Sequence, residues 1–487
     1  MKNILIVGAG PTGLVLSLAL LQRNIAVRII DEKDKPSEHS KALAIHPRTL
    51  EILAKLKVAD LFVERGRKAY SLTFHREEHE QKFKIDHLED TPYPYILILP
   101  QSETEKILIE AFEKMGGNIE WNSKLVGLDG NNAILSNQEK IPFDWIIACD
   151  GGRSSIRQYL DFSFKGYELE ETFLIVDVEG PSKAKDASPH LFFSKKGLVG
   201  VIAFKSCLSR LILPMPKNKK VSENIHSIKE ELDQRGCRNF ISPEQVRWFS
   251  YFKIHRRMVN KFRIGNCFLV GDAAHIHSPA GGQGMNICIQ DAFNLAWKLS
   301  LVLNNVAKTQ LLDSYEAERF PIARKVLKHT THATQLLDFI QSTGYFSLIF
   351  FILFFVKNFF KRKISRGLTE LSYVYKKSLF IQEPWRDIFW RGPKCGARAP
   401  NVKLENGKDL FDYFQYQNPF LLLFEDNDTL KELQCEILVI KDEKLKKAYK
   451  AKANSVFFIR PDGVIGYRSR NLKKAEIKSY LSNIFLT

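Results

Sequence analysis

The first third of the chain alternates short, wholly apolar runs with amphipathic stretches. The runs 4–7, 26–30 and 141–148 have the length and composition of buried strands, and the residues between the first two follow a helical spacing. The alternation of strand and helix patterns resumes at the apolar run 267–270. A glycine-rich segment follows this run and leads into a helical pattern that extends to Leu299. Alternating strands and helices predict an α/β fold built on a mostly parallel sheet.

A different pattern occupies residues 345–356, which are strongly apolar and are followed by basic residues up to Arg366. About twelve apolar residues are too few to span a bilayer. We interpret the stretch as a buried helix at an interdomain or dimer contact. The alternative is an apolar stripe with a basic flank, 345–366, that makes peripheral contact with an anionic membrane.

Composition narrows the function only a little. The chain has 487 residues, 45% of them hydrophobic, and a net charge of +17, which suits two to four globular domains with a basic surface. Because no basic helix is interleaved with aromatic residues and no zinc-finger spacing occurs, we expect no nucleic-acid partner. The seven cysteines form no C-x-x-C pair, and most of them are expected to be buried, in a reducing compartment. The first strand begins at once, so we expect no cleaved signal peptide and a cytoplasmic location.

The first candidate site follows the first apolar run. Gly8, Gly10 and Gly13 form a G-x-G-x-x-G sequence between a predicted strand and a predicted helix, and Asp31 follows the second strand about twenty positions on. In this context Gly8 permits a tight turn, Gly10 lets a pyrophosphate approach, and Gly13 lets the helix pack on the strand. Asp31 would accept hydrogen bonds from a ribose. The pattern predicts a bound dinucleotide.

Two further motifs stand at strand-to-helix junctions. Asp150 precedes two glycines, Arg153 and Arg157, as at the edge of a ligand site, although a helix-capping turn explains Asp150 equally well and Arg157 could be merely exposed. Asp272 precedes the glycine-rich segment 279–284 at the start of the last helical pattern. Glycines beside a helix N-terminus suit a group that carries or develops negative charge. The simpler alternative is that these glycines only make the turn.

Together the three motifs resemble the FAD-dependent aromatic hydroxylases, the single-component flavoprotein monooxygenases related to p-hydroxybenzoate hydroxylase and phenol hydroxylase. The resemblance covers residues 1–327. Asp31 stands where the family usually has Glu and Lys41 where it has Arg, so both charges are kept. Asn266 replaces a common Arg, and Cys288 a common Gly.

The resemblance implies a set of residues around FAD. The adenine half would lie along the first motif, with Lys41 and Gln101 near the pyrophosphate and ribityl chain, and Asp272 bound to a ribityl hydroxyl. The amides of the last loop would stabilise negative charge on reduced flavin. The backbone of Pro279, Gly282 and Gly284 would lie near the reacting face. The full cofactor-binding set is Gly8, Gly10, Gly13, Asp31, Lys41, Gln101, Asp150, Asp272, Gly282, Gly284, Met285 and Asn286.

The resemblance also implies the activity. FAD would be reduced by NADPH or NADH, react with O2 to a flavin hydroperoxide, and hydroxylate a phenolic or polycyclic aromatic substrate. A disulfide reductase of similar fold would need a second G-x-G-x-x-G and a redox cysteine pair, which the sequence lacks. Two alternatives stay open: an epoxidase or reductase of an isoprenoid lipid, and a non-catalytic flavin-binding redox regulator. A metal site of Asp272, His275 and His277 is conceivable, but the flavin loop accounts for the histidines better, so we expect no metal.

The same resemblance implies how the chain is divided into domains. It implies a Rossmann-type FAD-binding domain from 1–70, 96–170 and 262–330, and an inserted β-sheet substrate domain from 71–95 and 171–261, where period-two alternation is clearest. A helical connector, 331–393, would lead to a thioredoxin-like domain, 394–487, with no C-x-x-C and hence a structural or dimer-related role. The protein is expected to be a monomer or homodimer. Candidates for the substrate pocket are Phe192, Phe193, Phe204, His255 and Arg257, and a structural role is the alternative for Arg257.

Overall fold

The computed structural model describes residues 2–343 and 361–486, apart from 39, 41, 86–87, 195, 206, 217–218, 278–279, 377, 415–417, 431 and 434. Within those ranges no helix is both long and apolar enough to cross a bilayer. The stretch 345–356 lies outside the described residues, so both interpretations of 345–366 stay predictions.

A six-stranded sheet forms the centre of the molecule, in the order β18-β19-β12-β1-β2-β8. Strands β19, β12, β1, β2 and β8 run parallel to one another, and β18 pairs antiparallel with β19. The predicted α/β fold is therefore confirmed. The strands are β1 (Ile4–Val7), β2 (Arg28–Ile30), β8 (Ile119–Glu120), β12 (Trp145–Ala148), β18 (Arg263–Ile264) and β19 (Cys267–Leu269).

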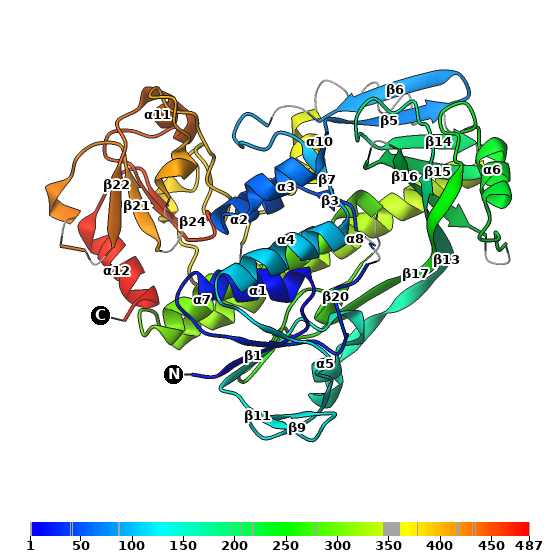
Figure 1. Ribbon diagram of the computed structural model, residues 1–487. Coiled ribbons are helices and arrows are strands. Elements are labelled where there is room, and N and C mark those ends of the chain that lie inside the picture. The colour runs from blue at the N-terminus through cyan, green and yellow to red at the C-terminus, as the bar shows by residue number, and fades with distance from the viewer. Residues whose placement is uncertain are drawn as a thin grey trace.

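Three helices pack around this sheet: α1 (Pro11–Leu21), α4 (Gln101–Lys114) and α7 (Gly284–Leu303). Helix α1 contacts both of the others, and Figure 1 shows the three running side by side. Helix α7 is buried along nearly its whole length, and its apolar residues join those of β1, β12 and α1 in one core. The short helices α2 (Pro47–Lys55), α3 (Ala59–Arg65) and α5 (Ser155–Tyr159) complete this region.

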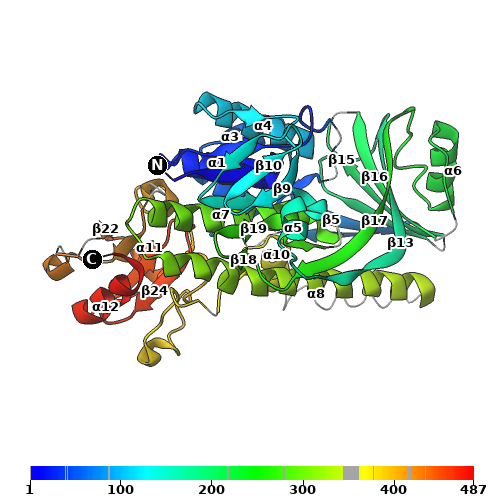
Figure 2. The ribbon, with the colours of Figure 1, turned by 90° about the horizontal axis from the view of Figure 1, so that it is seen from below.

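An eight-stranded sheet, in the order β20-β17-β13-β16-β15-β14-β5-β6, flanks the central sheet. Helix α6 (Ile225–Gln234), which the sequence pattern did not indicate, covers its far face. Figure 2 shows α6 at the side of the sheet that faces away from β18 and β19. The strands are β5 (Ser71–Arg76), β6 (His79–Lys84), β13 (Phe164–Glu179), β14 (His190–Ser194), β15 (Gly197–Ala203), β16 (Leu208–Met215), β17 (Gln245–Val259) and β20 (His275–Ile276).

The single strand predicted at 141–148 is in fact two. Strand β11 (Lys140–Pro142) belongs to a small antiparallel sheet with β10 (Asn132–Leu135) and β9 (Leu125–Asp129), while β12 belongs to the central sheet. The chain changes sheets at Phe143 and Asp144, whose backbone amides bond to loop carbonyls instead of to a strand partner. A third small sheet contains β3 (Ala44–Ile45), β7 (Ile96–Ile98) and β4 (Arg67–Ala69).

The long helix α8 (Asp313–Thr343) and the helix α10 (Lys361–Leu368) precede a four-stranded C-terminal sheet in the order β22-β21-β23-β24. Strands β21 and β22 pair parallel, and the other pairs are antiparallel. The thioredoxin-like assignment of 394–487 stays a prediction. The C-terminal elements are β21 (Phe420–Leu423), β22 (Glu436–Val439), α11 (Glu443–Tyr449), β23 (Val456–Ile459), β24 (Ile465–Ser469) and α12 (Lys474–Ile484).

Candidate functional site

The motifs of the sequence meet at one edge of the central sheet. Val7 lies opposite both Ile30 and Ala148, and Ala148 lies opposite Leu269. The four parallel strands therefore end at the same level, and each is followed within three residues by a motif residue. The carboxyl edge of a parallel sheet is where open α/β folds bind their ligands.

The glycines of the first motif have different surroundings. A Cβ on Gly8, whose φ is 105°, would lie 2.4 Å from the carbonyl oxygen of Cys149, and a Cβ on Gly13 would lie 1.9 Å from the carbonyl oxygen of Gly8. Both glycines are thus required by close packing within the chain. A Cβ on Gly10, in contrast, would meet no atom within 4 Å. Gly10 precedes α1, whose first turn has no side-chain cap and no acidic residue, so this open surface faces unsatisfied amides that suit a phosphate.

Asp31 is fixed against this loop. One of its carboxylate oxygens accepts a hydrogen bond of 2.7 Å from the backbone of Ala9, and the other accepts one of 2.9 Å from the backbone of Lys33. The lone pairs left over suit the hydroxyls of a ribose. Gln101 begins α4, where its backbone donates to the hydroxyl of Ser40 and its side chain donates to Glu105 over 2.9 Å. Lys41 lies outside the described residues, so its pyrophosphate contact stays a prediction.

Asp150 shares the capping role that the sequence left open with Ser154, the N-cap residue of α5. Asp150 Oδ2 accepts a 2.7 Å hydrogen bond from the backbone of Ser155 at the start of α5. Its Oδ1 is buried and has no hydrogen-bond partner among the described residues, and burial raises the pKa of the carboxyl. Arg157 is buried, contrary to the alternative that it is exposed, and donates to the carbonyls of Ala273 and Gly152. Asp150 thus organises the turn and retains one free acceptor.

The third motif brings the starts of α1 and α7 together. A Cβ on Gly271, whose φ is 63°, would lie 2.8 Å from the Cβ of Cys288 and 3.0 Å from the hydroxyl of Thr12. Only glycine allows this approach. Asp272 is exposed and accepts a 3.4 Å hydrogen bond from the Cys288 thiol, so most of its carboxylate is open to a ligand.

The loop before α7 is held in a conformation that glycine favours. Gly281 and Gly282 have φ values of 83° and 64°, and Gly284 begins the helix. The first turn of α7 has no side-chain cap and no acidic residue. Its amides therefore remain available to a group with negative charge. Pro279 lies outside the described residues, so its predicted place near the flavin stays a prediction.

Asn286 and His46 fix this loop. Asn286 donates from Nδ2 to the carbonyls of Ala44 and Gly282, over 2.9 and 2.8 Å, and its Oδ1 accepts from the backbone of His46 over 2.8 Å. His46 Nε2 lies 3.1 Å from the carbonyl of Gly281, and burial lowers the pKa of His46 to about 4, which keeps the ring neutral. The side chain of Asn286 is fully used within the chain, so it positions the loop. The neighbouring Met285 is half-buried against the core.

His275 has a structural partner. Its Nε2 lies 2.7 Å from Asp291, and the other oxygen of Asp291 accepts from Arg319 over 2.5 Å. Burial alone would raise the pKa of Asp291, but Arg319 and His275 hold it below its usual value. His275 therefore pairs with Asp291 and not with Asp272. Among the described residues, no three His, Cys, Asp or Glu side chains are arranged to hold a metal ion.

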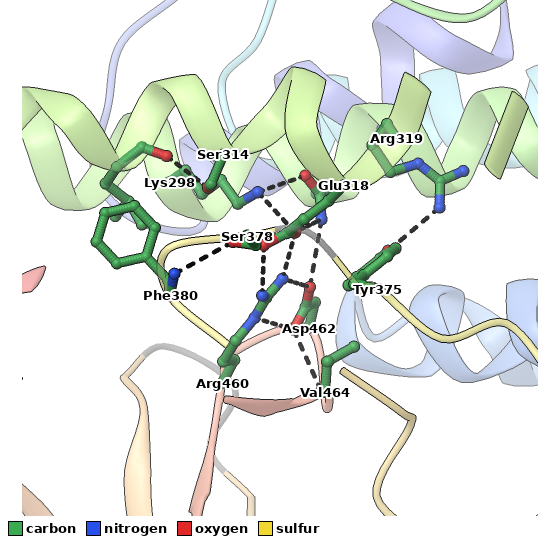
Figure 3. Close-up of polar contacts among 12 residues, drawn as sticks. Lys298, Ser314, Glu318, Arg319, Tyr375, Ser378, Phe380, Arg460, Asp462 and Val464 are labelled. Carbon is green, nitrogen blue, oxygen red and sulfur yellow. Dashed lines mark hydrogen bonds and ion pairs between the residues drawn. The ribbon is translucent and has the colours of Figure 1, made fainter. Parts of the chain in front are cut away.

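A buried polar stripe along α7 leads from this loop to the C-terminal sheet. It consists of residues at every fourth position, Asn286, Gln290, Asn294 and Lys298. Lys298 and Asn294 donate to Glu318 of α8 over 2.8 and 2.9 Å. Arg460 binds both oxygens of Glu318, over 2.7 and 2.8 Å, so the network closes between α7, α8 and the turn after β23 (Figure 3).

Sequence reasoning missed His46, Asp291 and the stripe. The signal that was present is a row of polar residues at helical spacing inside an otherwise apolar helix. Such a row is typical of a solvent-facing helix surface. Arg48 is also buried, and it donates to Glu51 and to the carbonyl of Asp462. The pocket candidates are scattered: Phe192 stacks on His75, Phe193 on Phe74, and His255 lies near Glu168.

Comparison with known proteins decides the family. A family model described as an FAD binding domain matches residues 1–330 of the chain. The chain belongs to this FAD-binding family. The cofactor of this family is FAD, so the expectation of an FAD-binding protein is confirmed.

The flavoprotein is similar to curated monooxygenases. It is 36% identical to 6-methylpretetramide 4-monooxygenase of Streptomyces rimosus over 69% of this chain and 62% of that protein, so it spans less than two thirds of that relative's length. It is 30% identical to pentachlorophenol 4-monooxygenase of Sphingobium chlorophenolicum over 86% of this chain and 79% of the other. The solved structure of the anhydrotetracycline hydroxylase OxyS from Streptomyces rimosus shares the fold, with a TM-score of 0.81, 24% identity and 99% of each chain covered.

Proposed function

We propose that this flavoprotein is a monooxygenase that uses NAD(P)H and O2 to hydroxylate a phenolic or polycyclic aromatic substrate. The observation that carries the proposal is the pair of uncapped helix starts, α1 and α7, at one edge of the sheet, with the open surface at Gly10 before α1. The names of the relatives, which refer to a pretetramide, a chlorinated phenol and an anhydrotetracycline, support an aromatic substrate.

The residues fit FAD because each part of the cofactor has a chemically suited partner. The amides after Gly10 would bind the pyrophosphate, Asp31 the ribose, and Asp272 a ribityl hydroxyl. The first-turn amides of α7 would lie against the flavin ring, where the positive end of the helix stabilises negative charge. Bound FAD supplies transfer of electrons from the nicotinamide and activation of dioxygen.

The chain's own contribution is to hold this edge rigid. Asn286 and neutral His46 fix the loop at Gly281 and Gly282 without adding a second positive charge beside the α7 amides. Strand β20 forms one edge of the eight-stranded sheet, and it lies only a few residues before that loop in the chain. We infer that this sheet carries the substrate and excludes water from the reacting face.

We further propose the division of the chain set out above: 1–70, 96–170 and 262–330 bind FAD, 71–95 and 171–261 bind the substrate, 331–393 connect, and 394–487 form a thioredoxin-like unit. A cytoplasmic location and a monomeric or homodimeric state belong to the same proposal. The lipid epoxidase alternative predicts that an isoprenoid lipid, and no aromatic compound, stimulates nicotinamide oxidation by the purified protein.

A screen of phenols and polycyclic aromatics tests the activity. Purified protein loaded with FAD should oxidise NADPH or NADH faster with a suitable substrate, and mass spectrometry should show a product heavier by one oxygen atom. Failure to bind FAD even after reconstitution would contradict the proposal. Nicotinamide oxidation with no oxygen insertion for any aromatic would favour the redox regulator.

A further inference from the structure

The most exposed large apolar side chains of the described part all lie in one short stretch. Leu379, Trp385, Ile388 and Phe389 are 76%, 82%, 55% and 93% exposed, and none of the others exceeds the 52% of Tyr167. We name residues 379–389 the apolar platform. Single exposed apolar residues are ordinary on a protein surface, whereas a group of aromatic and branched side chains marks a contact site.

The platform has a fixed backbone. Buried Arg468 of β24 pairs with Glu383 and donates to four backbone carbonyls on and just after the platform, those of Asp387, Trp390, Gly392 and Pro393. The buried carboxylate of Asp387 accepts from the hydroxyl of Ser469 and the backbone of Arg470. The exposed rings are therefore presented by a firmly bound turn.

The charges around the platform are asymmetric. Its acidic groups are satisfied within the chain, because Glu383 pairs with Arg468 and the nearby Glu476 pairs with Arg386 over 2.5 Å. Three flanking cations, Lys376, Arg391 and Lys394, are exposed and form no ion pair with any residue in the described ranges. The platform thus presents apolar rings beside uncompensated positive charge, on a chain whose net charge is +17.

We propose that the apolar platform docks on an anionic membrane surface. Trp and Phe side chains insert at the level of the lipid headgroups, and flanking Lys and Arg attract anionic lipids. Figure 2 shows the gold stretch between α10 and the C-terminal sheet projecting from the body of the molecule. A projecting tip enters a fluid lipid interface readily, whereas a two-fold contact between copies needs a self-complementary surface.

Flotation with lipid vesicles tests the proposal on the full, FAD-loaded chain. The protein should float with vesicles of phosphatidylcholine and phosphatidylglycerol, far less with phosphatidylcholine alone, and less as salt rises. The double variant Trp385→Ala, Phe389→Ala should lower the bound fraction at least about tenfold. Met115→Ala, which shortens an exposed side chain at the end of α4, is the matched control and should bind as the parent does. Replacing both Arg391 and Lys394 by Gln should remove the preference for anionic lipid.

Flavin content and thermal unfolding establish that the variants are folded. Absence of binding by the parent protein would overturn the proposal. Equal binding by the parent and the double variant would also overturn it, because the contact would then lie elsewhere, for example in 345–366. Self-association of the parent that the double variant abolishes, without vesicle binding, would assign the platform to a second copy of the chain.

Discussion

Replacing Gly10 by Ala separates the requirements of FAD from those of the fold. The backbone at Gly10 has φ −74° and ψ −178°, which alanine adopts without strain, and the added methyl group meets no protein atom. Reduced chain entropy in the unfolded state should stabilise the variant by about 0.4–1 kcal/mol, and the poorer N-cap should cost a similar amount. The stability of the FAD-free protein should therefore hardly change.

FAD binding should change greatly. The methyl group would stand where we place the pyrophosphate, and one lost charge-assisted hydrogen bond is worth about 1.5–3 kcal/mol. The dissociation constant for FAD should rise by about ten- to 150-fold. Titration of the FAD-free protein, followed by flavin fluorescence, measures the constant, and thermal unfolding of the same preparation measures stability.

Two glycine variants serve as controls. In Gly13→Ala the methyl group would lie 1.9 Å from the Gly8 carbonyl, so β1 and α1 must separate and the FAD-free protein should lose at least about 1–3 kcal/mol. Gly367→Ala in α10 also meets no atom within 4 Å and should leave FAD affinity unchanged. Unchanged FAD affinity in Gly10→Ala, or a loss of stability like that of Gly13→Ala, would refute the placement of the pyrophosphate.

Three further predictions concern charged groups. Glu318→Gln removes the counter-ion of buried Lys298 and one of the two carboxylates that pair with buried Arg460, and it should lower the free energy of unfolding by about 3–5 kcal/mol. Lys140→Ala, in an exposed pair, should cost under about 1 kcal/mol, and similar losses for the two variants in denaturant titrations would contradict this. Burial raises the pKa of Glu370 from 4.5 to about 8, so the folded state keeps a proton that the unfolded state loses, and stability should fall as pH rises between these values. Glu370→Gln should remove that slope in thermal unfolding, and an unchanged slope would count against it. Asp272→Ala should weaken FAD retention on gel filtration at least about tenfold more than Arg257→Ala, and equal retention would count against the ribityl contact.

The local motifs were predictable because glycine geometry acts over a few residues. The turn at Gly8 and the close packing at Gly13 depend on the strand that precedes them and the helix that follows. The carboxyl edge of a parallel sheet then brings the motifs together with no further information from the sequence.

The long-range polar contacts were not predictable. Asn294 and Lys298 have a spacing typical of a surface, yet they are buried against Glu318, and Asn294 reaches Asp462, 168 positions away. A single sequence does not show which distant acidic residue will bind a given buried polar residue. The split of 141–148 and the helix α6 were missed for a related reason, since tertiary contacts and not apolar content decide where the chain changes sheets.

The claim that this edge of the sheet supports oxygen transfer is tested most directly by isotopic labelling. FAD-loaded protein is reduced photochemically without nicotinamide, mixed with an aromatic substrate from the screen, and exposed to isotopically labelled dioxygen. We expect a product with one labelled oxygen atom for each flavin reoxidised. Flavin that reoxidises and yields only hydrogen peroxide, or a product whose oxygen comes from water, would contradict it.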